Sequence, residues 1–333
     1  MNPWSLAWRR FCRDRLGLVC LVVVLIYIAL VTATAAGWIV RDWSTEVGVS
    51  YAPPSFLGPE IVSKGDSSKS ENPAPAQEDT GIVDPLANDL AEIAKELTGG
   101  STASEARAAT LAFGGDKWGR DVLKKALKGT ETSLFVGLAA AAFATVLGTL
   151  CGAQAGYYGG WVDDFFNWLY SVFTSIPYLL LVLAVAAVVN QKGTLTVILI
   201  LGLTGWTGIF RLVRAEYLKH KVREYVLAAD AIGASGARRM FVHILPNVSH
   251  VVLVQLSLHV VLFIKSEVIL SFLGFGVGVD TVSWGSMLAE AQSELILGKW
   301  WQIAAATAAM AVLVTAFSLL TDAMRDALDP RLK

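Results

Sequence analysis

The sequence is poor in charge and in cysteine. Only 17% of its 333 residues are Asp, Glu, Lys or Arg, against about 25% in ordinary soluble domains. The formal net charge is −1, which gives no indication of a nucleic-acid partner. The three cysteines, Cys12, Cys20 and Cys151, have neither the spacing of metal ligands nor that of a disulfide framework. We therefore expect no nucleic acid, no metal site and no disulfide scaffold.

Long apolar runs are abundant instead, and 54% of the residues are hydrophobic. A soluble core also holds apolar residues, but in short amphipathic pieces rather than in long, nearly uncharged runs. Each run here has about the length that crosses a bilayer core of about 30 Å. The six runs cover roughly residues 16–40, 132–156, 166–190, 194–213, 248–273 and 301–321. We predict an all-α polytopic membrane protein with about six transmembrane helices.

The charges of the connecting segments predict the orientation. Segment 214–247 is rich in Lys and Arg, whereas segment 275–298 is mainly acidic. Cytoplasmic loops carry an excess of Lys and Arg, so we expect segment 214–247 and both termini in the cytoplasm. The first apolar run exceeds the roughly 7–15 residues of a signal-peptide core, so an uncleaved helix is expected. The predicted parts are a cytoplasmic N-terminus (1–15), a first span (16–40), a partly disordered periplasmic insertion (41–129), a core with spans 2–6 (130–321) and a cytoplasmic tail (322–333).

Shorter elements are predicted between the spans. Residues 60–80 read as flexible, and helical spacing predicts short helices over 86–97 and about 118–128. Good helix formers continue through 216–232, and segment 275–298 is expected to be an outer loop. We also hypothesise that its Trp284-Gly285 and glycine-rich parts form a re-entrant or gating element. The tryptophans near the run ends are assigned to interfacial belts; they are Trp161, Trp168, Trp206, Trp284, Trp300 and Trp301.

Segment 223–247, REYVLAADAIGASGARRMFVHILPN, contains the most informative pattern. Gly233 is expected to end one helix, because glycine adopts positive φ without steric cost. Residues 234–244 can form a second short helix, and Pro246 marks the start of the next membrane helix. The pattern predicts two short helices at an angle on the inner face of the membrane. An ordinary amphipathic surface loop is the alternative.

This segment resembles the EAA motif of permease subunits in binding-protein-dependent ABC importers. That motif has Glu-Ala-Ala, three residues, Gly, nine residues, then a hydrophobic residue and Leu-Pro. The matching residues here are Leu227-Ala228-Ala229, then Gly233, then His243-Ile244-Leu245-Pro246. Leu227 stands where the motif has Glu. This difference does not affect the predicted two-helix shape, but a leucine side chain cannot make the polar contact that Glu could make there.

Other strings resemble the dipeptide and oligopeptide permeases of the C type within this family. They lie at 116–138, 155–164, 267–276, 283–288 and 319–333. In this order and at these spacings they are together highly specific. The resemblance covers 110–333 strongly and 1–40 weakly, and the insertion at 45–110 has no counterpart.

The resemblance implies the ABC importer type I permease fold and a bacterial inner-membrane location. It implies a subunit that, with a second homologous permease, forms a pathway for peptide uptake. Two ATPase subunits and a periplasmic solute-binding protein are the other expected partners, besides the lipid bilayer. The chain has no G-x-x-x-x-G-K-[ST] phosphate loop, so we expect ATP to be used by the partner ATPases and no cofactor to be bound here.

The resemblance also assigns residues. The loop around 226–240 is expected to be the coupling helix, with coupling residues Ala228, Ala229, Ala231, Gly233, Ala234, Arg238, Arg239, Leu245 and Pro246. His259, Lys265 and Glu267 are candidates to line the pathway, since ionisable groups inside a membrane face the bundle or water. Pairing within the helix bundle is the alternative for these three.

Other functions remain open. A permease for nickel or another small solute fits the same family. A secondary transporter or channel usually has inverted repeats or interrupted helices with buried charges, and neither is clear here. An intramembrane enzyme needs a nucleophile with a base, or a metal site; H-E-x-x-H and G-x-S-x-G are both absent from the sequence. We therefore assign no catalytic residue.

Overall fold

The computed structural model describes residues 10–58, 107–278 and 280–328. Within these ranges the regular elements are helices, accompanied by isolated backbone bridges in one short region. The chain divides into two compact units. One comprises Met1–Trp43 with Lys124–Lys333, and the other comprises Ser44–Leu123. The helical class predicted from the sequence is confirmed for the described residues.

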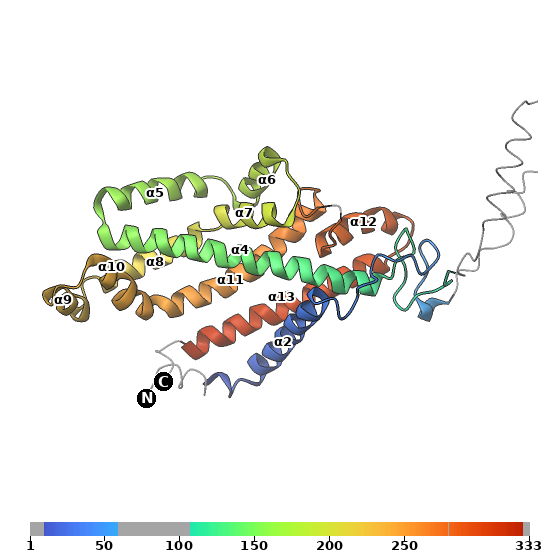
Figure 1. Cartoon of the computed structure of the whole chain (residues 1–333), viewed down its shortest axis with the longest axis horizontal. Coiled ribbons are helices and arrows are strands. Elements are labelled where there is room, and N and C mark those ends of the chain that lie inside the picture. The colour runs from blue at the N-terminus through green and yellow to red at the C-terminus, as the bar shows by residue number, and fades with distance from the viewer. Residues whose placement is uncertain (1–9, 59–106, 279, 329–333) are drawn as a thin grey trace, which may run out of the picture. The chain divides into compact units, whose positions relative to one another are not determined.

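Four helical stretches are long and apolar enough to cross a membrane (Figure 1). They are α2 (Arg15–Ala35), α4 (Val122–Tyr158), the run Gly236–Phe272 and α13 (Trp301–Leu328). The run Gly236–Phe272 consists of α10 (Gly236–Arg238), the π-helical η2 (Arg239–Ile244) and α11 (Leu245–Phe272). Two bent helix pairs bring the number of candidate spans to six, which agrees with the predicted count.

The bent pairs correct two predictions of continuous helices. The run at 166–190 breaks between α5 (Gly160–Thr174) and α6 (Tyr178–Val189), which are bent by 88°. Pro177 explains the break, because proline lacks a backbone N–H and disfavours helical geometry in the residue before it. The run at 194–213 breaks between α7 (Thr194–Thr204) and α8 (Thr207–His220) with a bend of 42°. Gly205, a poor helix former, lies at that break.

Three shorter predictions are also corrected. The helix expected at 118–128 and the span at 132–156 are one helix, α4, in which the Asp121 carboxylate accepts a hydrogen bond from the Leu123 N–H (2.8 Å). Segment 275–298 is not only a loop, since it contains α12 (Trp284–Ile296). The helix expected over 216–232 is divided into α8 and α9 (Glu224–Ala231). The predicted features at 60–80 and 86–97 lie outside the described residues.

Helices α4 and α8 pack with their backbones close together. Gly148, Gly152 and Gly156 lie four residues apart on α4 and form one ridge facing α8. A Cβ atom at Gly156 would lie 2.7 Å from the Arg214 carbonyl oxygen, and one at Gly148 would lie 2.5 Å from that of Trp206. Small residues at this spacing allow close helix packing within membranes. The ridge therefore fixes α8 against α4.

A buried polar network joins α4, α11 and α12 near the first turns of α4. Glu267 on α11 is fully buried and accepts hydrogen bonds from Ser133 (2.7 Å) and Ser271 (2.7 Å). Trp284, the first residue of α12, is also fully buried, and its indole N–H donates to the Ala126 carbonyl (3.2 Å). Its backbone N–H donates to Ser133 (3.2 Å). Each polar group in this network thus has a hydrogen-bond partner in a low-dielectric setting.

The tryptophan predictions are therefore only partly correct. Trp206, Trp284 and Trp301 are buried in the helix bundle, so their assignment to interfacial belts is wrong. Trp161 and Trp168 are exposed on α5, by 78% and 62%, which is compatible with that assignment. Position near a run end did not distinguish the two groups.

Residues 44–58 and 107–123 are the described parts of the smaller unit. Backbone hydrogen bonds join them, including Gly48 N–H to Gly119 O (2.9 Å) and Val49 N–H to Ala108 O (3.0 Å). The short 3-10 helix η1 (Ser55–Leu57) lies in the first part. Asp116 is fully buried, and its carboxylate accepts from the N–H groups of Trp118 and Arg120. Backbone hydrogen bonds therefore hold the two described parts of this unit together.

Candidate functional site

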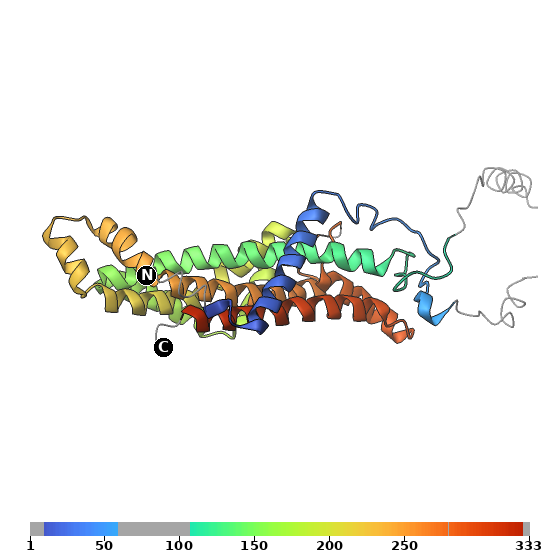
Figure 2. The ribbon, with the colours of Figure 1, turned by 90° about the horizontal axis from the view of Figure 1, so that it is seen from below.

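The segment between α8 and α11 emerges at one end of the helix bundle. Helices α9 and α10 lie beside the last turns of α4 and α8, whereas α12 packs near the first turns of α4 (Figures 1 and 2). A helix of 37 residues is about 55 Å long. Segment 223–247, which we call the docking loop, is therefore at the opposite end of α4 from α12.

Glycine ends the first helix of the docking loop as the sequence predicts. Gly233 follows α9 with a φ of +84°, and its N–H donates to the Asp230 carbonyl (2.8 Å). The next N–H, that of Ala234, donates to Ala229 (2.9 Å). These bonds satisfy carbonyls left without a partner at the end of the helix. Arg239 then forms an ion pair with Asp230 across the turn.

The second helix of the docking loop is not separate from α11. Ser235 accepts a hydrogen bond from the Arg238 N–H as the N-cap of α10, and helical geometry continues through η2 into α11. The π-helical turn directly precedes Pro246. Proline cannot donate to the carbonyl four residues back, and its ring collides with that carbonyl. A wider π turn at this place accommodates the ring without ending the helix.

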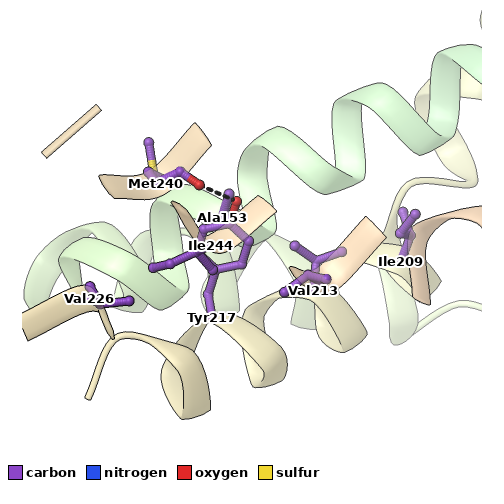
Figure 3. Packing of buried hydrophobic residues seen from close by; sticks show 8 residues of the cluster. Ala153, Ile209, Val213, Tyr217, Val226, Met240 and Ile244 are labelled. Carbon is purple, nitrogen blue, oxygen red and sulfur yellow. Dashed lines mark hydrogen bonds between the residues drawn. The ribbon is translucent and has the colours of Figure 1, made fainter. Parts of the chain in front are cut away.

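The inner face of the docking loop is packed on the bundle (Figure 3). Val226, Met240 and Ile244 from the loop share a buried cluster with Tyr217 of α8 and Ala153 of α4. Figure 3 shows the Tyr217 hydroxyl directed at the Met240 carbonyl, to which it donates at 3.0 Å. Both residues are buried. The loop is therefore attached to α8 by apolar contact and one directional bond.

The outer face of the docking loop is apolar and exposed. Leu227 is 55% exposed and Ile232 86%, and Val222, just before the loop, is 65% exposed. Ala228 and Ala231 also lie on this face, whereas Ala229 points inward and is buried. Leu227 thus places an exposed hydrophobic side chain where the resembling motif has Glu. The residues at positions 227, 228, 231 and 232 thus form an exposed apolar patch among charged neighbours such as Asp230. Exposed apolar patches are typical of protein interaction surfaces.

Basic residues border this patch. Arg238 is exposed, while Arg239 lies over the Tyr157 ring at 5.8 Å in addition to its pair with Asp230. At the first turn of the loop, His220 Nδ1 and the Tyr225 hydroxyl are 2.7 Å apart. Partial burial raises the pKa of Tyr225, so its hydroxyl stays protonated at neutral pH. The His220–Tyr225 contact therefore holds the start of the loop, and the Arg239–Asp230 ion pair holds the turn at Gly233.

The remaining predicted coupling residues have different surroundings. Gly233 is exposed, Ala234 is half-buried, and Leu245 and Pro246 lie in the first turn of α11. Arg238 and Ala231 are exposed and free of the buried cluster. The predicted set therefore contains both an outward-facing group and residues that shape the turns behind it.

The three pathway candidates do not form one site. Glu267 lies in the buried network with Ser133 and Ser271, which favours a structural role within this chain. His259 is buried on α11 between Thr145 (3.5 Å) and Gln255 (3.4 Å). Lys265 is exposed on α11. The sequence did not identify Tyr217, whose aromatic type alone carries no signal for its contact with the loop.

The membrane-spanning helices, with their two bent pairs and the helical loop at one end, define a polytopic helical membrane protein. Comparisons identify its family. The family model described as "Binding-protein-dependent transport system inner membrane component" matches residues 144–333, and the chain belongs to that family. The model for the "N-terminal TM domain of oligopeptide transport permease C" matches residues 2–54.

Individual relatives are similar over about two thirds of the chain. The dipeptide transport system permease protein DppC of Bacillus subtilis is 37% identical over 221 residues, which are 66% of this chain and 69% of the relative. The oligopeptide transport system permease protein OppC of the same organism is 35% identical over 66% of this chain and 72% of the relative. OppC of Mycobacterium tuberculosis is 31% identical over 66% and 75%. The protein is a multi-pass inner-membrane transport component.

Proposed function

We propose that this chain is a permease subunit for peptide uptake in an ABC importer, with the docking loop as its contact to the ATPase. The relatives named above are dipeptide and oligopeptide permeases, and none of those three is named for nickel. A second permease subunit, two ATPase subunits and a periplasmic binding protein complete the proposed complex. ATP is used by the ATPase subunits, and the N- and C-termini lie in the cytoplasm.

The observation that carries the proposal is the two-sided construction of the docking loop. Its outer face exposes Leu227 and Ile232, and its inner face is buried on α8 and α4. Apolar side chains exposed outside the spans gain free energy when a partner covers them. A partner bound there can push or pull α8 and α11, because the inner face is attached to both helices.

Coupling needs one further condition. Nucleotide binding to the ATPase alters the permease only if the docked loop has different free energies in the two permease conformations. The bends at the α5–α6 and α7–α8 breaks are positions where the spans can change angle. We propose that displacement of the docking loop is absorbed at these breaks.

Cross-linking tests the assignment in the assembled transporter. In a Cys12→Ser background, which removes an exposed native thiol, Ala231→Cys should cross-link to the ATPase subunit. Ile296→Cys is the matched control, because it is 87% exposed on α12 at the other end of α4. Ala231→Cys linked only to periplasmic proteins, with Ile296→Cys linked to the ATPase, would reverse the proposed orientation.

A further inference from the structure

A cavity lies where both broken spans break. It has a volume of about 230 Å³ and is lined by Tyr170, Thr174, Thr207, Gly208, Arg211 and Leu212. Thr174 is the last residue of α5, and Thr207 is the first residue of α8. In secondary transporters, substrates bind at interrupted membrane helices, where helix ends and unpaired backbone groups line the site, and a break can serve in the same way in another class of transporter. The position alone therefore identifies this cavity as a candidate binding site.

Arg211 supplies a cation to the cavity. It is exposed on the face of α8 opposite the buried Ile209, Phe210 and Val213. Its guanidinium donates to the Tyr170 hydroxyl (3.4 Å), and no carboxylate among the described residues forms an ion pair with it. A charged side chain within a span is costly unless it faces water or a partner of opposite charge. Arg211 is therefore a cation at the cavity that an entering anion could pair with.

The neighbouring arginine shows the contrast. Arg214 has a carboxylate partner, Asp163, which it contacts at 2.5 and 2.6 Å. Arg211 precedes Arg214 by about 4.5 Å along α8, whereas Tyr170 lies about 10 Å beyond Asp163 on the antiparallel α5. Arg211 is thus about one turn nearer to the helix breaks than Arg214, whose charge already has a carboxylate partner.

The rest of the lining also suits an anion. Tyr170, Thr174 and Thr207 line the cavity with Arg211, and of their hydroxyl groups that of Tyr170 accepts the hydrogen bond from the guanidinium. The first turn of α8 contributes Thr207 and Gly208, and the N-terminal end of a helix attracts negative charge. The volume is below the roughly 300–1,000 Å³ of pockets that enclose a whole small ligand. It fits one end of a longer molecule.

We propose that this cavity binds the C-terminal carboxylate of the peptide during its passage, with Arg211 as the residue that contacts it. The inference rests on the proposed function, because every unmodified peptide carries this group whereas its side chains vary. An Arg–carboxylate pair is a strong and directional contact. Arg211 then selects for a free C-terminus inside the membrane, after the binding protein has released its peptide.

Uptake of labelled trialanine into proteoliposomes that contain the whole transporter tests the proposal. Arg211→Gln should lower the number of peptides taken up per ATP by about tenfold, as expected for the loss of a charged hydrogen bond. Arg211→Lys should retain most of the uptake because it keeps the charge. Lys219→Gln is the matched control, since Lys219 is on the same helix but pairs with Glu216 outside the cavity. It should transport like the unmodified protein.

A second measurement avoids the binding protein. Leu212→Cys should react with a small neutral thiol reagent, and millimolar trialanine should slow that reaction more than trialanine amide does. The difference should disappear when Arg211→Gln is added. Equal protection by the acid and the amide with Arg211 intact would overturn the proposal.

Other results have distinct meanings. A parallel loss of ATPase stimulation, or of the co-purified second permease, with Arg211→Gln would assign Arg211 to coupling or assembly and overturn the proposal. It would also be overturned if Arg211→Gln has an effect only in vesicles with anionic lipid, since a lipid phosphate would then be the ligand. If the unmodified transporter takes up no peptide, the proposed function itself fails.

Discussion

The two ends of α4 are built from different interactions. Near its first turns, Glu267, Trp284 and Ser133 are buried and joined by hydrogen bonds. Near its last turns, the docking loop is held mainly by an apolar cluster and one buried bond from Tyr217, and its outer face is exposed. Directional bonds in a dry interior tolerate little change. Apolar contacts have no preferred direction, so that end of the bundle can move without losing a specific geometry.

The difference separates residues that stabilise the bundle from residues that couple it to a partner. Changes near α12 are expected to lower stability whatever the partner does. Changes in the docking loop are expected to alter coupling while the membrane helices stay folded. Each experiment below therefore measures both thermal stability in detergent and the ratio of transport to ATP hydrolysis.

The largest expected effect is that of Trp284→Ala. Removing a fully buried indole from the α4–α12 contact leaves a cavity, which costs about 3–5 kcal/mol. We expect a clear fall in the unfolding temperature of the purified chain. Trp161→Ala is the control, because that side chain is 78% exposed, and a loss of stability equal to that of Trp284→Ala would contradict the comparison.

Glu267→Ala should have the next largest effect. The substitution leaves the hydroxyls of Ser133 and Ser271 without their buried acceptor, at a cost of about 1–3 kcal/mol for the unsatisfied groups. We expect lower stability with an unchanged number of peptides per ATP in the protein that remains folded. Lys265→Ala, at an exposed position on the same helix, should leave stability nearly unchanged. Normal stability with altered peptide selection in Glu267→Ala would instead assign Glu267 to the pathway.

The sequence predicted the number of spans and the turn at Gly233 because each depends on local composition or on one residue's allowed φ. It did not predict α12 or the burial of Trp284, since both depend on contacts with α4, whose facing residues are more than a hundred positions away. Pro177 is a local signal for a helix break, but the run at 166–190 was predicted as one span because of its length and apolar composition. The role of Tyr217 in the candidate site could not be predicted either, because it depends on a contact with Met240 that only the tertiary structure shows.

Gly233→Val tests the docking-loop end of α4, where we expect an effect on coupling rather than on stability. Valine is strained at a φ of +84°, which costs about 1–2 kcal/mol, and the strain should tilt α9 relative to α10. We expect ATP hydrolysis to continue with less transport, while the unfolding temperature changes little. Gly298→Val is the matched control, because Gly298 has a φ of +77° and open space around it at the α12 end. Equal uncoupling by both variants would show that the docking loop has no special role.

Tyr217→Phe is the smallest and most specific change. It removes one hydroxyl from a buried site and leaves the apolar cluster in place, so the stability cost is about 1 kcal/mol. The Met240 carbonyl still accepts from the Leu245 N–H, and the loop can remain docked on the ATPase. If the hydroxyl transmits loop movement to α8, transport per ATP should fall severalfold although ATPase binding is unchanged. Tyr157→Phe, which keeps the ring beneath Arg239, should have no such effect. If the two variants transport equally well, apolar contact alone joins the loop to α8, and the movement must pass through the continuous helix from η2 into α11.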